Sequence, residues 1–283
     1  MGGFRFKVVL PDGSVYLTTT LAEAQAIDTR GRRQRGGKAR NPYTSKFTPE
    51  GGKFVQYGYS KEDVAARHAK KAQKVEALRH KEQSLRSAVK RDVRGDDLPA
   101  LVVGLILETY ERPGNTRSAK EGHFGVTGWL CRHLDASGKR AVIEYVAKSG
   151  VLQRKTIRDP YLVAALSRRK QHCDKDGTRL LPVSASAVNR YLREYGVSAK
   201  DLRTFGANSE MASELKRARR HGPRLDTLKL GDVKKTLKAE FNAALGIVAG
   251  KLGHTTNVLR KQYLVATVEP LYLETGAVVS TFA

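Results

Sequence analysis

The chain of 283 residues is poor in cysteine, in acidic side chains and in long apolar runs. Its two cysteines, Cys131 and Cys173, provide no disulfide framework, and we expect them to suit a reducing compartment. No apolar run approaches the roughly 20 residues that a membrane-spanning helix needs, and the first ten residues lack the apolar core of a secretory signal. The sequence therefore predicts a soluble, intracellular protein with no membrane partner.

Basic side chains are abundant instead, since 52 Lys and Arg against 28 Asp and Glu give a formal charge of +24. Such a charge favours a polyanionic partner, and nucleic acid is the common one. A hydrophobic content of 40% is enough for globular folding, and the length suits one large domain or two smaller ones. Because histone-like and ribosomal proteins are equally basic, the charge indicates a partner without indicating an activity.

Several kinds of catalytic site are absent from the sequence. It has no Gly-x-x-x-x-Gly-Lys-Ser/Thr nucleotide loop. The cysteines and histidines lack zinc-ligand spacing, and the acidic residues do not cluster as a two-metal nuclease requires. We therefore expect no cofactor and no metal, so that any phosphodiester chemistry would depend on protein cations.

The N-terminal region alternates between strand patterns and a basic loop. Residues 4–10 and 15–19 flank a Pro-Asp-Gly turn signal and predict a pair of short strands. Residues 30–40 contain six cations and three glycines, which predicts a loop that either contacts DNA phosphates or is simply solvated. The six cations are Arg30, Arg32, Arg33, Arg35, Lys38 and Arg40.

A further strand is predicted at residues 54–59, where Gln56, Tyr57 and Tyr59 lie close together. Glutamine can hydrogen-bond a base edge and tyrosine can contact sugar and phosphate, so these residues are candidates for DNA binding. Tyrosines are also ordinary strand residues, and simple packing is the alternative.

From residue 63 onward the pattern becomes mostly helical. Helices are predicted at 63–93 and 98–110, and three antiparallel strands at 124–134, 140–147 and 151–157. We expect an α+β fold with a small β-rich DNA-clamping domain at 1–62 and a catalytic domain at 63–283. Lys148 would occupy a hairpin tip between the last two strands.

A histidine and a tyrosine near the end of the chain suggest catalysis. Gly253 is typical of a helix end, and Thr256 with Asn257 is typical of the next helix start. Tyr263 would then lie about two turns into that helix, close to His254, as a nucleophile for a phosphate. A tyrosine with apolar neighbours is more often part of a core, so the pair needs support from the rest of the chain.

Five motifs in order supply that support. In chain order they are Gln56-Tyr-Gly-Tyr, Arg112-Pro-Gly-Asn with Glu121-Gly-His-Phe-Gly-Val-Thr, Val146-Ala-Lys-Ser-Gly, Lys200-Asp-Leu-Arg-Thr-Phe-Gly-Ala-Asn, and Gly253-His-Thr-Thr with Tyr263. Their order resembles the type IB DNA topoisomerases of the compact poxvirus and bacterial kind, over about residues 54–268. The resemblance implies a DNA breaking-rejoining fold and relaxation of double-stranded DNA without ATP or metal.

The same resemblance implies a role for each residue. Tyr263 would attack the scissile phosphorus to give a 3′-phosphotyrosyl link, while Arg112, Arg203 and His254 would hold its non-bridging oxygens. Lys148 would protonate the leaving 5′-oxygen. Lys200 and Asn208 would support this group. Swivelling of the duplex then relaxes supercoils of either sign, and one nucleophile suffices, which favours a monomer.

Departures from the family pattern and two rival functions remain. Ser118 stands where poxvirus relatives have a tyrosine, and the segment between Arg203 and His254 is longer than theirs. A tyrosine recombinase or integrase shares the nucleophile and the cationic pocket, but usually has His-x-x-Arg where this chain has Lys200-Asp-Leu-Arg203. A non-catalytic DNA-packaging protein would explain the charge but not the ordered motifs.

Overall fold

A computed structural model describes residues 6–9, 15–20, 22–23, 45–49, 56–58, 61–147 and 150–279. The chain divides into two compact units, residues 1–70 and residues 71–283. Helix α2 (Lys61–Arg94) runs through the division. The predicted boundary at residue 62 and the functions assigned to the two domains stay predictions.

In the described part of the first unit, four short antiparallel strands form a sheet in the spatial order β2-β1-β3-β4. Their bounds are β1 (Phe6–Val9), β2 (Val15–Thr18), β3 (Ser45–Pro49) and β4 (Gln56–Gly58). The two strands expected around the Pro-Asp-Gly turn correspond to β1 and β2, whereas β3 was not expected. That this region forms a β-rich DNA-clamping domain stays a prediction, and the basic residues 30–40 lie outside the described residues.

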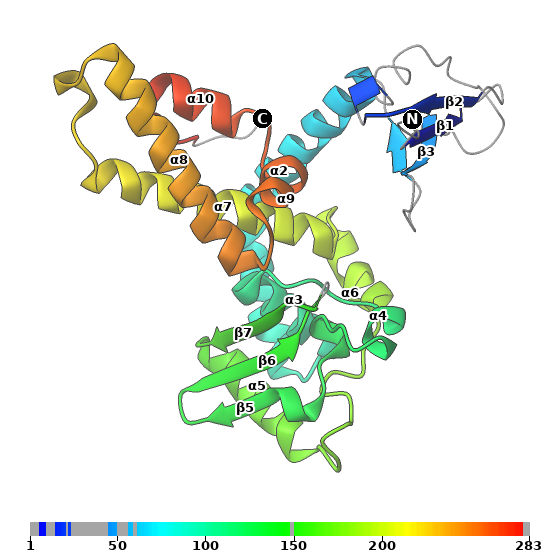
Figure 1. Cartoon of the computed structure of the whole chain (residues 1–283). Helices are drawn as coiled ribbons and strands as arrows, with labels where there is room; N and C mark the ends of the chain where they lie inside the picture. The colour runs from blue at the N-terminus through cyan, green and yellow to red at the C-terminus, as the bar shows by residue number, and fades with distance from the viewer. Residues whose placement is uncertain are drawn as a thin grey trace. The chain divides into compact units, whose positions relative to one another are not determined.

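The second unit is mostly helical and carries a three-stranded antiparallel sheet (Figure 1). Its helices after α2 are α3 (Leu98–Thr109), α4 (Thr116–Lys120), α5 (Pro160–Gln171), α6 (Ala185–Leu192), α7 (Ala199–His221), α8 (Leu230–Leu252), α9 (Thr256–Val258) and α10 (Val268–Thr275). The α+β class expected from the sequence is confirmed for this unit. Among the helices of the described ranges, none is both long and apolar enough to cross a bilayer.

Helix α3 forms the centre of the core, because nearly all of its side chains are apolar and buried. Asp97 caps its start by accepting a hydrogen bond from the Ala100 backbone N–H at 2.7 Å, and Pro99 suits the first turn. The helix ends where Tyr110 adopts a left-handed conformation, with a φ of 52°. Both boundaries agree with the sequence pattern.

The sheet has the order β5-β6-β7, with β5 (Leu134–Ser137), β6 (Arg140–Val146) and β7 (Leu152–Ile157). The second and third strands lie where they were predicted, but the first was predicted wrongly at 124–134. That segment instead forms two tight turns, η1 (Val126–Gly128) and η2 (Cys131–His133). Its apolar side chains are buried by tertiary packing rather than by strand pairing, so hydrophobicity alone misled the prediction.

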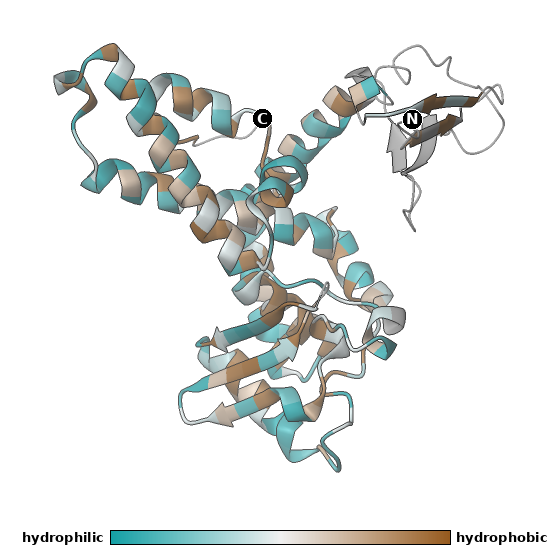
Figure 2. Ribbon diagram, in the orientation of Figure 1, coloured by the Kyte–Doolittle hydropathy of each residue, from teal (hydrophilic) through white to brown (hydrophobic). Residues whose placement is uncertain are grey.

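Helices α7 and α8 pack against each other as a long antiparallel hairpin, and α10 packs on α8 (Figure 1). Hydrophilic and hydrophobic residues alternate along both helices (Figure 2), and the buried apolar residues of each belong to the common core. The hairpin joins Arg203, near the start of α7, to His254, just beyond the end of α8. It therefore brings two motifs separated by 51 positions back to one place.

The cysteine prediction is contradicted, because Cys131 and Cys173 form a disulfide with a Cα–Cα distance of 6.0 Å. Cys131 lies in η2, and Cys173 follows the end of α5. The Lys170 ammonium donates to the Cys131 carbonyl at 2.7 Å, which holds the two segments together. The two cysteines are close because of helix packing, which a spacing of 42 residues in the sequence does not reveal. Since they form a disulfide, they give no support to the expected reducing compartment.

Candidate active site

Four predicted residues from four separate segments meet in the second unit. An Arg203 Nη2 lies 2.9 Å from His254 Nε2, and an Arg112 Nη2 lies 3.5 Å from His254 Nδ1. The Tyr263 ring stacks on the His254 ring, with centroids 4.6 Å apart. The Arg203 guanidinium also lies over the Tyr263 ring, 5.7 Å from its centroid. Two arginines thus flank a stacked histidine and tyrosine.

The segment that carries Arg112 is fixed by close contact between glycines. A side chain at Gly125 would lie 2.6 Å from the Gly114 nitrogen, so only glycine fits there. The Val126 N–H donates to the Arg112 carbonyl at 2.9 Å, and Thr127 donates to the Pro113 carbonyl. The two halves of the first motif are therefore one unit, which orients the Arg112 backbone.

A second glycine contact fixes the end of α3 against α7. The Tyr110 ring lies so close to Gly206 that any side chain at this position would overlap it. Gly206 is three residues beyond Arg203 on α7, and Tyr110 is two residues before Arg112. This contact therefore holds the two arginines at a set separation.

Arg203 is almost completely buried, with 3% exposure. Its guanidinium donates to His254, to the Leu252 carbonyl and, at 3.5 Å, to a Glu111 carboxylate oxygen. Burial lowers the pKa of Arg203, and the nearby Glu111 carboxylate opposes that shift. An arginine remains protonated even so, which leaves a fixed positive charge beside the tyrosine.

His254 owes its position to a left-handed helix end at Gly253, whose φ is 65°. Burial lowers the pKa of His254 to about 3, and Arg203 and Arg112 reinforce the shift, so the imidazole is neutral near pH 7. Because Arg203 donates to Nε2, the single ring proton belongs on Nδ1. Nδ1–H points to the side of Arg112 and can donate to an anion placed there.

Tyr263 ends the five-residue π-helical turn η6 (Leu259–Tyr263), whereas the sequence suggested a regular helix. Asn208, 1% exposed, donates to the Tyr263 carbonyl at 3.0 Å and accepts from the Val265 N–H at 2.9 Å. The Lys71 ammonium donates to the carbonyl of Leu264 at 3.1 Å. These bonds hold the backbone on both sides of the tyrosine, and the supporting role expected for Asn208 stays a prediction.

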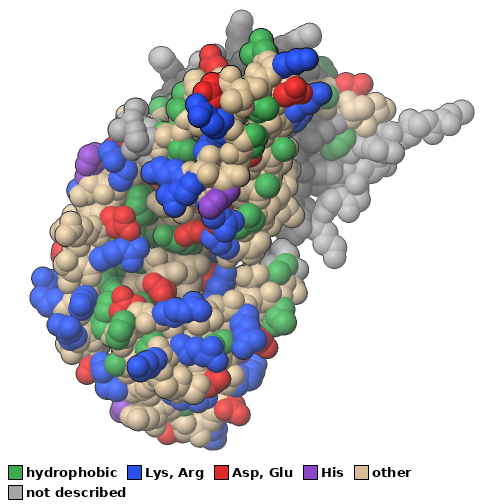
Figure 3. Space-filling view, turned by 90° about the vertical axis from the view of Figure 1, so that its left-hand side faces the viewer, with side chains coloured by type: hydrophobic (Ala, Val, Ile, Leu, Met, Phe, Trp, Pro, Cys, Tyr) green, Lys and Arg blue, Asp and Glu red, His purple; other side chains and the backbone are tan. Residues whose placement is uncertain are grey.

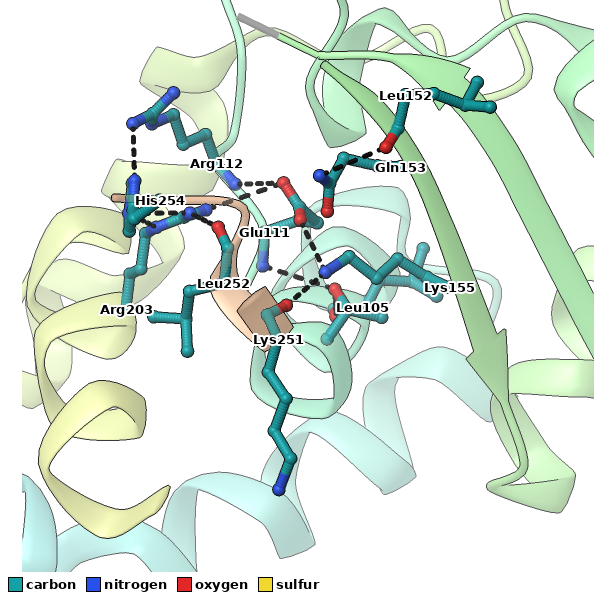
Figure 4. A network of polar contacts seen from close by, with 11 residues as sticks. Leu105, Glu111, Arg112, Leu152, Gln153, Lys155, Arg203, Lys251, Leu252 and His254 are labelled. Carbon is teal, nitrogen blue, oxygen red and sulfur yellow. Dashed lines mark hydrogen bonds and ion pairs between the residues drawn. The ribbon is translucent and has the colours of Figure 1, made fainter. Parts of the chain in front are cut away.

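Two residues at the site, Glu111 and Lys155, belong to none of the sequence motifs that predicted it. Figure 4 shows Glu111 between Arg203 and Lys155, and the Lys155 ammonium lies 3.0 Å from a Glu111 carboxylate oxygen. Glu111 directly precedes Arg112 at the end of an apolar helix, where a carboxylate is unexpected. Lys155 alternates with Gln153 along β7, and this period-two pattern could have placed both on the inner face.

Other predicted residues are not assembled in this group. Lys148 lies outside the described residues, as do Tyr59 and the cations at positions 30–40. Gln56 and Tyr57 belong to β4 of the first unit. Lys200 is exposed on the first turn of α7. The pKa of Lys71 is lowered mainly by burial and, to a smaller extent, by the charge of Lys200. The contribution of Lys200 to catalysis stays a prediction.

The surface of the molecule is strongly basic. Lys and Arg side chains are spread over the described face shown in Figure 3, with fewer acidic side chains between them. The chain carries 52 Lys and Arg in all against 28 Asp and Glu. A surface of this kind attracts a phosphate backbone over a wide area.

Comparison with known families identifies the class of protein. The sequence model of the catalytic core of eukaryotic DNA topoisomerase I matches residues 61–272, well over half of the chain. The chain belongs to this family, and is therefore of the type IB topoisomerase class, an isomerase that acts on DNA inside cells. No individual curated protein matches the chain.

Proposed function

We propose that this protein is a compact type IB topoisomerase, of the kind found in poxviruses and bacteria, that relaxes supercoiled duplex DNA. The observation that carries the proposal is the convergence of Arg112, Arg203, His254 and Tyr263 from four segments of the chain. Tyr263 is the nucleophile, and the group around it is cationic where a phosphate would bind.

In the proposed reaction Tyr263 loses its phenolic proton to solvent, its oxygen attacks the scissile phosphorus, and the bond from phosphorus to the 5′-oxygen breaks. Arg112 and Arg203 donate to the non-bridging oxygens, and the neutral His254 donates through Nδ1. Lys148 delivers a proton to the leaving 5′-oxygen. The 3′-phosphotyrosyl bond conserves the phosphodiester, so rejoining needs neither ATP nor a metal ion.

Between cleavage and rejoining, the free 5′ end rotates about the intact strand and supercoils of either sign relax. We propose that Lys200 supports the bound phosphate and that Gln56, Tyr57, Tyr59 and the cations of residues 30–40 contact the duplex. A single nucleophile is sufficient for this cycle, and the protein acts as a monomer.

The deciding experiment is relaxation of negatively and positively supercoiled plasmid in EDTA without ATP. Wild type relaxes both, and a denaturant traps a protein linked to a 3′ end of the DNA. Tyr263→Phe retains the ring that stacks on His254 but lacks the nucleophilic oxygen. We therefore expect it to bind DNA and to form neither adduct nor relaxed product, at least about 10⁴-fold below wild type.

Each rival function has its own outcome in this experiment. An adduct that forms only on paired recombination sites, without relaxation of ordinary plasmid, would indicate a tyrosine recombinase. Binding without any adduct would indicate a DNA-coating protein. Retention of relaxation by Tyr263→Phe would show that another residue is the nucleophile.

A further inference from the structure

A buried carboxylate lies among the cations of the site. Glu111 is 4% exposed, and one of its oxygens lies 3.0 Å from the Lys155 ammonium. The other oxygen lies 3.5 Å from Arg203 Nη1 and accepts from the Arg112 backbone N–H at 3.3 Å. Glu111 therefore contacts two side chains of the site and the backbone of a third residue, as Figure 4 shows.

The position of this carboxylate is itself well determined. Lys155 is only 11% exposed and also donates to the Lys251 carbonyl at 2.5 Å, at the end of α8. Glu111 follows the rigid end of α3, which the Tyr110 ring secures against Gly206. The carboxylate thus has anchors on β7, α3 and α8, with the buried Tyr145 beside it, and the charged partner that it can orient toward His254 is Arg203.

The charges explain why an acid is present at a site where, on the proposed function, an anion binds. Burial tends to raise the pKa of Glu111, but Lys155 and Arg203 overcome it, and the pKa lies below its ordinary value. Glu111 is therefore ionised near neutral pH. Without it, the ammonium of Lys155 and the guanidinium of Arg203 would be two like charges buried near one another, and each would repel the other.

We propose that Glu111 is a positioning residue for DNA cleavage, which holds the Arg203 guanidinium against His254 and Tyr263 while Lys155 balances its charge. This inference rests on the proposed function, because it concerns the rate at which Tyr263 attacks the phosphate. Glu111 itself does not touch the reacting atoms. It acts through Arg203, which also donates to His254 and to the Leu252 carbonyl.

The test is single-turnover formation of the Tyr263–DNA adduct by Glu111→Gln, on a duplex containing a cleavage site mapped with the wild type. We expect adduct formation about 100-fold slower, the usual cost of misplacing a catalytic group by about 1 Å. The Kd for the same duplex should change by less than about 3-fold, because the exposed cations that bind phosphates are untouched. Glu111→Asp retains the charge and should recover part of the rate.

A methylphosphonate at the scissile position separates positioning from simple destabilisation. It removes the charge of the non-bridging oxygens, so an arginine that neutralises this charge contributes less. If Glu111 acts through Arg203, the defects of Glu111→Gln and Arg203→Ala shrink together on this substrate. A variant that is merely less stable would show the same defect on both substrates.

Two further variants complete the design. Glu144→Gln removes an exposed carboxylate from β6 of the same sheet, 3.9 Å from Arg154, and should cleave at the wild-type rate. In the double variant Glu111→Gln/Lys155→Gln the unbalanced lysine charge is gone, so adduct formation should be faster than in Glu111→Gln alone.

The outcomes are distinct. If the wild type forms the adduct and Glu111→Gln forms it at the same rate, the positioning role is overturned and the proposed function stands. An equal defect on phosphate and methylphosphonate would overturn it as well. If Glu111→Gln fails to fold, Glu111→Asp carries the same comparison of substrates. Absence of any adduct from the wild type would instead refute the proposed function.

Discussion

At the scale of single residues, motif order was a good guide to which side chains come together. Arg112, Arg203, His254 and Tyr263 were all predicted, and the structure brings them within contact distance. Their catalytic roles stay proposals. Glu111 was not predicted, because a lone carboxylate beside an arginine has no meaning until its burial and its partners are known.

The neutral state of His254 has a consequence for stability. Its pKa lies near 3 in the folded protein and at about 6.5 in an unfolded chain, so the unfolded state binds the extra proton first. The contribution of His254 to the free energy of unfolding is therefore fully present above pH 6.5, and it is lost as the pH falls toward 3. We expect the Tm of wild type to fall between pH 7 and 4.5 more steeply than that of His254→Gln.

His254→Gln is the matched control because its side-chain oxygen can still accept from Arg203. His133, whose pKa burial and then Arg132 lower to about 4, contributes equally to both proteins. Thermal unfolding followed by circular dichroism at several pH values gives the comparison. A difference in Tm that does not change with pH would contradict a depressed pKa for His254.

At the scale of elements, helix ends and tight glycine contacts determine where the site residues lie. Helix α8 ends at Gly253, as its sequence predicted, and His254 follows at once. The turn that carries Tyr263 is π-helical rather than α-helical, which the sequence did not indicate. Local propensity sets the ends of helices, whereas the winding of a short turn depends on what it packs against.

Gly253→Ala tests the importance of this helix end. The residue has a φ of 65°, and an added Cβ would lie 2.7 Å from the Gln153 side chain, so both strain and overlap oppose it. We expect a loss of about 1–3 kcal/mol in the free energy of unfolding, together with slower adduct formation. Denaturation in urea and single-turnover cleavage measure the two effects.

Gly246→Ala is the corresponding control on the same helix, because nothing lies within 4 Å of its added Cβ. Here alanine should stabilise the protein by up to about 1 kcal/mol through helix propensity. An equal effect of the two substitutions would mean that the conformation at Gly253 is unimportant.

The disulfide between Cys131 and Cys173 joins η2 to the end of α5. Restriction of the unfolded chain by a bond of this span contributes about 2–4 kcal/mol. We expect reductant to lower the free energy of unfolding of wild type by this amount. Cys131→Ser/Cys173→Ser should unfold at the lower value with or without reductant, and an unaffected wild type would show that the bond does not form in solution.

At the scale of the whole molecule, charge governs how the protein meets its substrate. A formal charge of +24 and a surface rich in Lys and Arg predict binding to any duplex, with little dependence on its sequence. Family membership identifies DNA as the substrate. The preferred cleavage site is a separate property, to be mapped by experiment.

Binding to duplex DNA should therefore weaken steeply with salt. If 6–10 phosphates are neutralised, the affinity falls by about 10³–10⁵ between 50 and 200 mM salt. Tyr263→Phe should have the wild-type slope of log K against log salt, because no charge changes. Arg112→Ala should have a shallower slope by about one unit, and fluorescence anisotropy measures all three. A slope near zero in the wild type would contradict electrostatic binding.

The amino-acid sequence alone determined the partner class, the ends of the main helices and the order of the candidate catalytic residues, because charge, capping residues and motifs are local properties. It did not determine the first strand of the sheet, the disulfide, or the pairing of Glu111 with Arg203 and Lys155. Each of these depends on which segments lie next to one another after folding. Only tertiary structure decides such contacts, since burial and pairing join residues that are far apart in the chain.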